Sequence, residues 1–365
     1  MKPTARHHTA VLSLVAAVFV VATTATVGRA QQRDLTATQR EDVVDFLEDL
    51  IAELTEVEKQ EIVSLATIVG AALQGQIVPT GEPFGWANDT LKAYDRQTFV
   101  PFTLSIEQSK VSTSVVAMYI FVAPAGGPAA APPTGASAAP ALPTAAFEDA
   151  YHVDLGAPTA DGVYEIRRGF SAPGGDYDVY VALSESGVSD GTEAKTMMLK
   201  RAVSVPDLWS DTLAMSSVIL VDRIESLSAP LPPDQQLANP YVLGGTTRLV
   251  PRGDRTFLTT EELSTFFLIY NAGLTSDGLP DVTVEFNFHT TGPDGEFFNT
   301  SGTQTFNAQT LQDGFDYAGG HQLQGGQVVP LSSFPEADYR LEITITDRTN
   351  NATLTRNVGF SVSAS

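Results

Sequence analysis

The sequence predicts a mainly β protein: two immunoglobulin- or fibronectin-like antiparallel β-sandwich modules that follow a short helical hairpin. From Phe99 onward, apolar and polar residues alternate with a period of two between clusters of Pro, Gly, Asp and Ser, as strands separated by turns do. No helical pattern intervenes between these runs, which favours antiparallel sandwiches over a parallel α/β sheet. The length of 365 residues exceeds one typical core, so we expect more than one domain.

The N-terminus has the pattern of a secretory signal peptide. Lys2 and Arg6 precede an apolar run over residues 10–27, and small residues end the segment at Ala30. This order predicts a signal peptide over residues 1–30 and a secreted, periplasmic or cell-surface protein. An uncleaved membrane anchor is the alternative reading. No later segment is long and apolar enough to cross a bilayer.

Composition narrows the partners and the chemistry. The chain has 43 acidic and 21 basic residues, a net charge of −22, and no cysteine. Removal of residues 1–30 takes away three cations and no acid, which lowers the charge to −25. Such a surface repels nucleic acids and acidic membranes. The lack of cysteine excludes thiol catalysis and cysteine-bound metals, and leaves stability to the hydrophobic cores.

The segment 35–75 is helical by periodicity. Apolar residues recur every three or four positions in two stripes, from Val43 to Leu54 and from Ile62 to Leu73,. A Thr-x-x-Glu capping box precedes each stripe, at Thr38 and at Thr55,. We therefore expect a helical hairpin, or one interrupted helix, that packs against the next domain; a partner-binding coiled coil is the alternative.

The first sandwich module is expected over residues 80–207. An Ala/Pro/Gly-rich insertion over residues 124–146 carries hardly any charge and is predicted to be a flexible loop between strands,. The predicted strands are residues 100–108, 114–123, 162–170 and 176–184.

The second sandwich module is expected over residues 208–365, and its end echoes the end of the first. In both modules a Pro-containing turn leads into Asp-Tyr, an alternating strand, a polar turn and a second alternating strand. Tyr177 and Tyr339 occupy equivalent places, where a sandwich uses a tyrosine hydroxyl to hold a corner. The predicted strands are residues 215–224, 263–272, 281–290, 338–347 and 355–364.

Several long segments resemble those of other proteins: TFVPFTLSIEQSKV, VPDLWSDTLAMSSVIL, ANPYVLGGT, FNAQTLQDGFDYAGGHQL and VPLSSFPEADYRLEITITD. They resemble an uncharacterised group of secreted bacterial (Acidobacteria-type) proteins whose Ig-like C-terminal regions accompany VWFA-related or GWxTD-type domains. The resemblance covers roughly residues 80–365. It implies an envelope or extracellular setting and offers no catalytic residues. The DxSxS metal motif of VWFA domains is missing from this sequence.

No motif of an enzyme active site is present. Outside the signal segment the histidines are His152, His289 and His321, and none belongs to a metal-binding pair such as HExxH,. No G-x-S-x-G nucleophile elbow occurs,. Acidic pairs such as Asp176/Asp178 and Glu261/Glu262 are expected from composition alone, although two carboxylates brought together by the fold would serve a glycosidase. We therefore predict no catalytic residues and keep a carbohydrate-active hydrolase as an alternative.

Calcium is the one cofactor with candidate ligands. Asp277 begins an Asp-Gly turn that is followed by Asp281, and Asp294 and Glu296 flank Gly295. Oxygen ligands in turns suit Ca²⁺, but ordinary turn chemistry is the simpler explanation. Arg252-Gly253-Asp254 is likewise expected to be a turn between strands.

Four aromatic residues are candidates for binding: Trp86, Trp209, Phe297 and Phe298. Each is placed beside a turn or a module junction, where it either fills a core or anchors a ligand. The leading hypothesis is a non-enzymatic exported envelope protein that binds another protein or a surface polymer through its Ig-like modules. A hydrolase with paired carboxylates and a ligand-free spacer or assembly subunit are the alternatives. The oligomeric state stays open.

Overall fold

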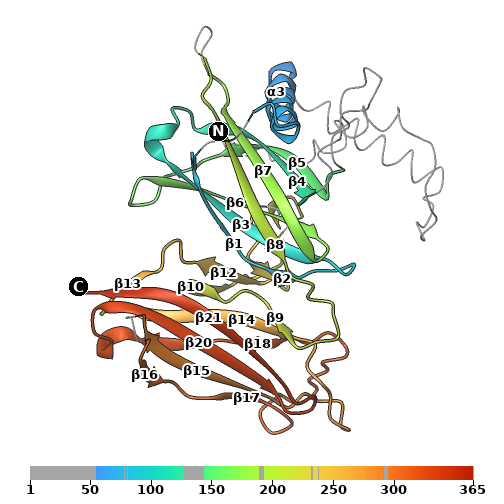
Figure 1. Ribbon diagram of the computed structural model, residues 1–365, viewed down its shortest axis with the longest axis vertical. Coiled ribbons are helices and arrows are strands. Elements are labelled where there is room, and N and C mark those ends of the chain that lie inside the picture. Colours follow the sequence, from blue (N-terminus) through green and yellow to red (C-terminus); the bar gives the residue numbers. More distant parts are fainter. Residues whose placement is uncertain are drawn as a thin grey trace, which may run out of the picture. The chain divides into compact units, whose positions relative to one another are not determined.

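The computed structural model describes residues 55–77, 79, 81–126, 144–188, 193–231, 233–236, 238–291 and 295–364 (Figure 1). Within them the chain is mainly β, with several antiparallel sheets and one long helix. It divides into two compact units. The first comprises the described residues up to Ala87, with 103–168 and 175–205; the second comprises 88–102, 169–174 and 206–365. The contiguous modules expected from the sequence therefore stay a prediction.

Helix α3 spans Glu56–Leu73, and Thr55 caps its start. The Thr55 hydroxyl accepts a hydrogen bond from the backbone N–H of Glu58, whose carboxylate accepts one from the Thr55 backbone. This reciprocal pair satisfies free amide groups of the first turn, as the sequence predicts. The buried face of the helix is formed by Ile62, Leu65, Val69 and Ala72.

The helix packs on a four-stranded antiparallel sheet in the order β5-β4-β7-β8. Its strands are β4 (Val115–Pro124), β5 (Phe147–Asp154), β7 (Gly175–Glu185) and β8 (Thr196–Val205). Tyr119, Phe121 and Ala182 face the helix, while Val116, Met118 and Ile120 are fully buried on the other face. Burial on both faces explains why β4 is a continuous apolar run rather than an alternating one.

A second four-stranded sheet has the order β1-β3-β2, with β6 also paired to β3. Asp95 and Arg96 both have φ of 56° in the turn between β2 and β3, which matches the twist of a two-residue hairpin. A short 3₁₀ helix, η1 (Gln108–Lys110), follows β3. The strands are β1 (Gly85–Asn88), β2 (Leu91–Lys92), β3 (Thr98–Glu107) and β6 (Val163–Ala172).

The second unit contains a sheet in the order β13-β21-β20-β15-β16, with β17 also paired to β15. The β20–β21 hairpin is its longest ladder, and β13 joins β21 in parallel. The Tyr339 hydroxyl donates a 2.8 Å hydrogen bond to the carbonyl oxygen of Pro335, which is the tyrosine corner predicted there. The strands are β13 (Thr256–Leu258), β15 (Val282–Thr290), β16 (Phe297–Thr300), β17 (Gln304–Phe306), β20 (Ala337–Asp347) and β21 (Ala352–Ser363).

The other sheet of this unit has the order β11-β12-β10-β14-β18, and β9 and β19 also pair with β14. The short helix α4 (Pro233–Gln236) lies between β10 and β11 in sequence, and the 3₁₀ helix η2 (Leu331–Ser333) follows β19 and leads to β20. The strands are β9 (Ala214–Met215), β10 (Ile219–Ser226), β11 (Val242–Leu243), β12 (Thr247–Pro251), β14 (Glu262–Tyr270), β18 (Leu323–Gly325) and β19 (Val328–Pro330).

Alternate residues of β14 supply two different cores. Phe267 and Ile269 join Phe286 and other residues of the β15–β20–β21 sheet in the main hydrophobic cluster. Phe266, Leu268 and Tyr270 project from the opposite face into a second cluster. That second cluster is covered by residues from distant parts of the chain: Leu91, Leu208 and Tyr241, with Phe99 packed against them.

The prediction of an antiparallel, mainly β fold is confirmed, and a strand is present in each run predicted from the period of two. The signal segment 1–30, the first helical stripe with its Thr38 box, and most of the insertion 124–146 lie outside the described residues. No helix in the described part of the chain is both long and apolar enough to span a bilayer.

Candidate binding site

The structure places the predicted aromatic residues in three separate environments. Trp209 follows β8; its indole N–H donates a 2.9 Å hydrogen bond to the Gln97 carbonyl oxygen, and the Lys92 ammonium lies 4.2 Å from the centre of its ring. Burial lowers the pKa of Lys92, against the opposing effect of Asp207. Trp209 therefore uses its polar group, and the ring surface over which Lys92 lies, within the second unit.

The other three aromatic candidates differ in burial. Phe298 packs against Phe334 and Tyr339, with ring centres 4.9 and 5.3 Å apart, so it belongs to the core. Phe297, its neighbour on edge strand β16, is 60% exposed, and its ring forms a T-shaped pair with the His289 ring. Trp86 is half-buried on β1.

The calcium candidates do not form a cluster of ligands in the described residues. Asp277 is exposed in a turn whose Gly278 has φ of 75°, and one carboxylate oxygen of Asp281 lies 3.9 Å from the Arg348 guanidinium. Asp294 lies outside the described residues, and Glu296 is exposed. Within the described ranges, no group of three His, Asp or Glu side chains is placed to hold a metal ion.

The remaining motif residues have partners in the fold. His152 Nε2 lies 2.9 Å from the Glu61 carboxylate on α3, and His321 Nδ1 accepts a hydrogen bond from the Asp316 backbone. His289 lies near the end of β15, and its Nε2 is 3.8 Å from a carboxylate oxygen of Glu342. The Arg-Gly-Asp sequence joins β12 to β13, as expected of a turn, and Arg252 is held by Asp222, Asp254 and Glu261.

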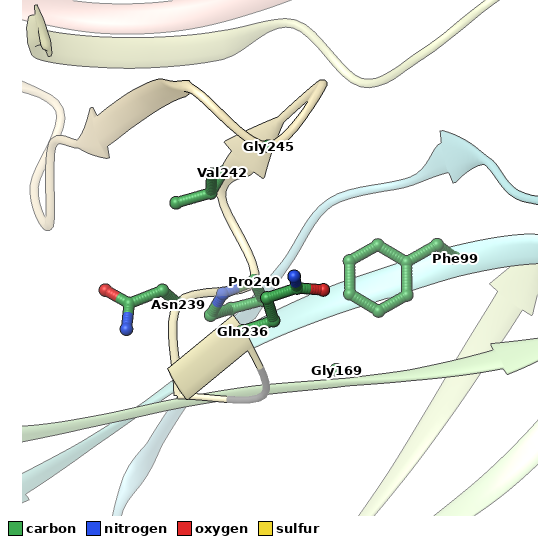
Figure 2. Close-up of a pocket in the computed structure, with 7 residues that line it drawn as sticks. All are labelled: Phe99, Gly169, Gln236, Asn239, Pro240, Val242 and Gly245. Atoms are coloured by element: carbon green, nitrogen blue, oxygen red, sulfur yellow. The ribbon is translucent and has the colours of Figure 1, made fainter. Parts of the chain in front are cut away.

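The structure also contains a pocket that none of these candidates marked. It has a volume of about 370 Å³ and lies within the second unit (Figure 2). Strands β3 and β6 supply one side, and the irregular segment from α4 to β11 supplies the other. Its lining consists of Phe99, Gly169, Gln236, Asn239, Pro240, Val242 and Gly245.

The aromatic wall depends on a missing side chain. A Cβ atom on Gly169 would lie 2.4 Å from Cζ of Phe99, far inside van der Waals contact. Because β6 pairs with β3, a glycine here lets the Phe99 ring lie directly on the neighbouring backbone. The ring is half-buried, so one part of its surface is fixed while another lines the pocket.

The opposite wall is a tight loop held at its centre by Tyr241. This side chain is 4% exposed, and its hydroxyl donates a 2.8 Å hydrogen bond to the Asp89 carboxylate. Burial raises the pKa of Asp89, and the hydrogen bond from Tyr241 opposes that rise. Gly244 and Gly245 take φ of 56° and 79°, where other residues are disfavoured, and turn the chain from β11 into β12.

Two carboxamides give the pocket its polar groups. Gln236 Nε2 donates to the Leu231 carbonyl oxygen at 2.8 Å, and Asn239 Nδ2 donates to the Gln235 carbonyl oxygen at 2.9 Å. Figure 2 shows the Gln236 carboxamide turned toward the Phe99 ring and the Asn239 carboxamide turned to the other side. Each amide is thereby oriented by its own loop, and its oxygen retains the capacity to accept hydrogen bonds.

None of the described residues of this lining carries an ionisable side chain. These described residues can hold a ligand by aromatic contact and neutral hydrogen bonds, and none of them is a general acid, general base or nucleophile. Sequence reasoning named no residue of this lining as a candidate for binding. It missed Phe99 and Gly169, because their contact depends on the pairing of β3 with β6.

No protein-family model matches this chain, and no curated protein does. Among solved structures, trypsin-activated alpha-2-macroglobulin from Escherichia coli aligns at 12% identity with a TM-score of 0.21, over 79% of this chain and 17% of that one. A Salmonella alpha-2-macroglobulin mutant aligns at 12% identity with a TM-score of 0.19, over 78% and 17%. This chain thus spans about a sixth of those proteins, and scores of this size establish no shared fold.

Proposed function

We propose that this protein is an exported, non-enzymatic binding and scaffold protein whose two Ig-like sandwich modules serve to bind a polymer at the cell surface. The signal-like N-terminus, the lack of cysteine and the resemblance to secreted bacterial proteins support the setting,. The tyrosine corner at Tyr339 and the similar placement of Tyr177 in the β7–β8 hairpin support the Ig-like assignment,.

The observation that carries the proposal is the chemistry of the pocket. The described residues of its walls combine one aromatic ring, glycine backbone and two carboxamides, and none of them is ionisable. Binding sites are built from such apolar surface with a few placed polar groups, whereas hydrolysis of a glycosidic bond requires two carboxylates beside the bond.

The acidic pairs noted in the sequence support the same conclusion. Asp178 forms a 2.9 Å ion pair with Lys200, and Glu261 accepts from Arg252 and from the Leu258 backbone. Backbone and guanidinium hydrogen bonds lower the pKa of Glu261. A general acid needs its pKa raised toward neutrality, so Glu261 is suited to a structural role.

The test compares retention with turnover. The chain purified without residues 1–30 is run in native gels that contain polysaccharide extracted from bacterial envelopes, and the same mixture is assayed for new reducing ends. We expect retarded migration and no new reducing ends. Turnover that is lost in Asp178→Asn or Glu261→Gln would establish the hydrolase instead. Unchanged migration with every extract would favour a ligand-free spacer or a protein-binding module.

A further inference from the structure

We infer that the pocket between Phe99 and the loop 236–245 binds an uncharged sugar unit of a polysaccharide, with the sugar ring stacked on Phe99. This inference rests on the proposed function and names the ligand class of that same site. It follows from the aromatic wall, the carboxamides and the lack of charge, taken in turn below.

The aromatic wall is suited to stacking. The Phe99 ring lies against the Gly169 backbone, and this contact restricts the rotamer freedom that a bound ligand would otherwise remove. The face of an aromatic ring carries negative potential, and the C–H groups on one face of a pyranose are weakly positive and apolar. A sugar ring laid on Phe99 buries that face and leaves its hydroxyl groups at the ring's edge.

The carboxamides are suited to those hydroxyl groups. The oxygen of Gln236, on the side of the pocket where Figure 2 shows Phe99, accepts a hydrogen bond from an O–H donor,. Its nitrogen is already tied to Leu231, which holds the amide in place. Asn239 is held by Gln235 in the same way. A purely apolar ligand that covered the Gln236 carboxamide would leave its oxygen without a donor, at a cost in binding free energy.

Charge decides between ligand classes. An anionic ligand would meet no cation among the described lining residues and would be repelled by a chain of net charge −22,. A cationic ligand would find no carboxylate among the described lining residues to pair with when it loses water,. The remaining class is a neutral, hydroxyl-rich ligand, and a cavity of about 370 Å³ lies within the range of small-ligand pockets, about 300–1,000 Å³.

The test uses affinity electrophoresis of the chain purified without residues 1–30 in native gels that contain dextran, galactomannan or polygalacturonate. We expect at least one neutral polymer to retard the protein and polygalacturonate to leave its migration unchanged. Phe99→Ala is expected to weaken the retarding affinity at least tenfold, and Phe99→Trp to retain it. Gln236→Glu, a change of nearly the same shape, is expected to weaken it several-fold.

Tyr94→Ala is the matched control, because Tyr94 is 90% exposed on the hairpin that leads into β3 and does not line the pocket. Circular dichroism checks that each variant is folded; if Phe99→Ala is unfolded, Gln236→Glu decides. The inference is wrong if no neutral polymer retards the protein, if polygalacturonate binds equally well, or if the pocket variants bind as Tyr94→Ala does. Retention of envelope polysaccharide alongside such a result would leave the proposed function standing.

Discussion

The hydroxyl of Tyr241 donates a hydrogen bond to the Asp89 carboxylate, 152 positions earlier in the chain. This single contact ties the pocket loop to the segment that leads into β2. Its two ends belong to the same unit although they are far apart in sequence, so the loop is held by a long-range contact rather than by local turn chemistry alone.

Removing that hydroxyl is expected to destabilise the second unit. Tyr241→Phe leaves a buried carboxylate short of a donor, which typically costs about 1–3 kcal/mol. Chemical denaturation would measure the loss, and sugar-polymer retention should weaken because the pocket wall loosens. Tyr94→Phe, at an exposed position, is the control. Equal unfolding midpoints for the two variants would contradict the assigned role of Tyr241.

The tyrosine corner predicts a second loss of stability. Tyr339 is 1% exposed, and Tyr339→Phe would leave the Pro335 carbonyl oxygen without this donor. We expect the free energy of unfolding to fall by about 1–2 kcal/mol, measured by denaturant titration. A variant as stable as the parent chain would show that the corner contributes packing alone.

Asp149 predicts a dependence of stability on pH. Burial raises its pKa to about 6, although Tyr151 and Ala150 donate hydrogen bonds to it and Arg168 lies nearby. Because the unfolded value is about 3.9, the contribution of this group to stability is complete below about pH 4 and is lost as the pH rises through about 6.

Asp149→Asn removes this titration. The stability of the variant relative to the parent chain should therefore rise between pH 4 and pH 7, by up to about 3 kcal/mol for a shift of about two pKa units. Denaturant titrations of both proteins across that range measure the difference, and other carboxylates cancel in the comparison. Parallel stability profiles would refute this role of Asp149.

The docking of α3 predicts a change in protection. The Glu61 carboxylate accepts a 2.7 Å hydrogen bond from the Ser186 hydroxyl and lies 2.9 Å from His152 Nε2. Glu61→Ala should increase hydrogen exchange and proteolysis within α3 at least several-fold, while the sheet beneath stays protected. Glu56→Ala is the control, because Glu56 is 82% exposed in a surface ion pair that contributes little. Identical cleavage of both variants would rule out an anchoring role.

The sequence predicted the strands because each has a local pattern. The two strands that begin near Tyr177 and Tyr339, and the hairpins that they form, were predicted from alternating apolar residues and from turn residues,. The capping box at Thr55 is equally local. Strand β4 departs from strict alternation because α3 covers its second face, and a residue pattern does not reveal which face another element covers.

The pocket could not be predicted from local sequence patterns, because its walls come from segments that are distant in the sequence. Phe99 contacts Gly169 only because β3 and β6 are neighbours in a sheet, and nothing near either residue specifies that pairing. The two tryptophans were chosen as binding candidates because of their residue type, but the indole N–H of Trp209 donates a hydrogen bond to the Gln97 carbonyl oxygen. The position of a side chain in the fold, rather than its type, decided which aromatic ring lines a cavity.

The two faces of β14 pack into two different hydrophobic clusters, and this has a consequence for truncated forms of the protein. The side chains of Phe266 and Leu268 on one face of β14 are covered by Leu91 and Leu208. Leu91 lies far earlier in the sequence than residues 206–365, which form most of the second unit. A fragment that starts at Pro206 would contain all strands of both sheets of this unit. It would lack Leu91 and Phe99, so the apolar side chains that they cover on β14 would be exposed to water. We expect this fragment to aggregate during expression, whereas a longer fragment that starts before Asn88 should remain soluble.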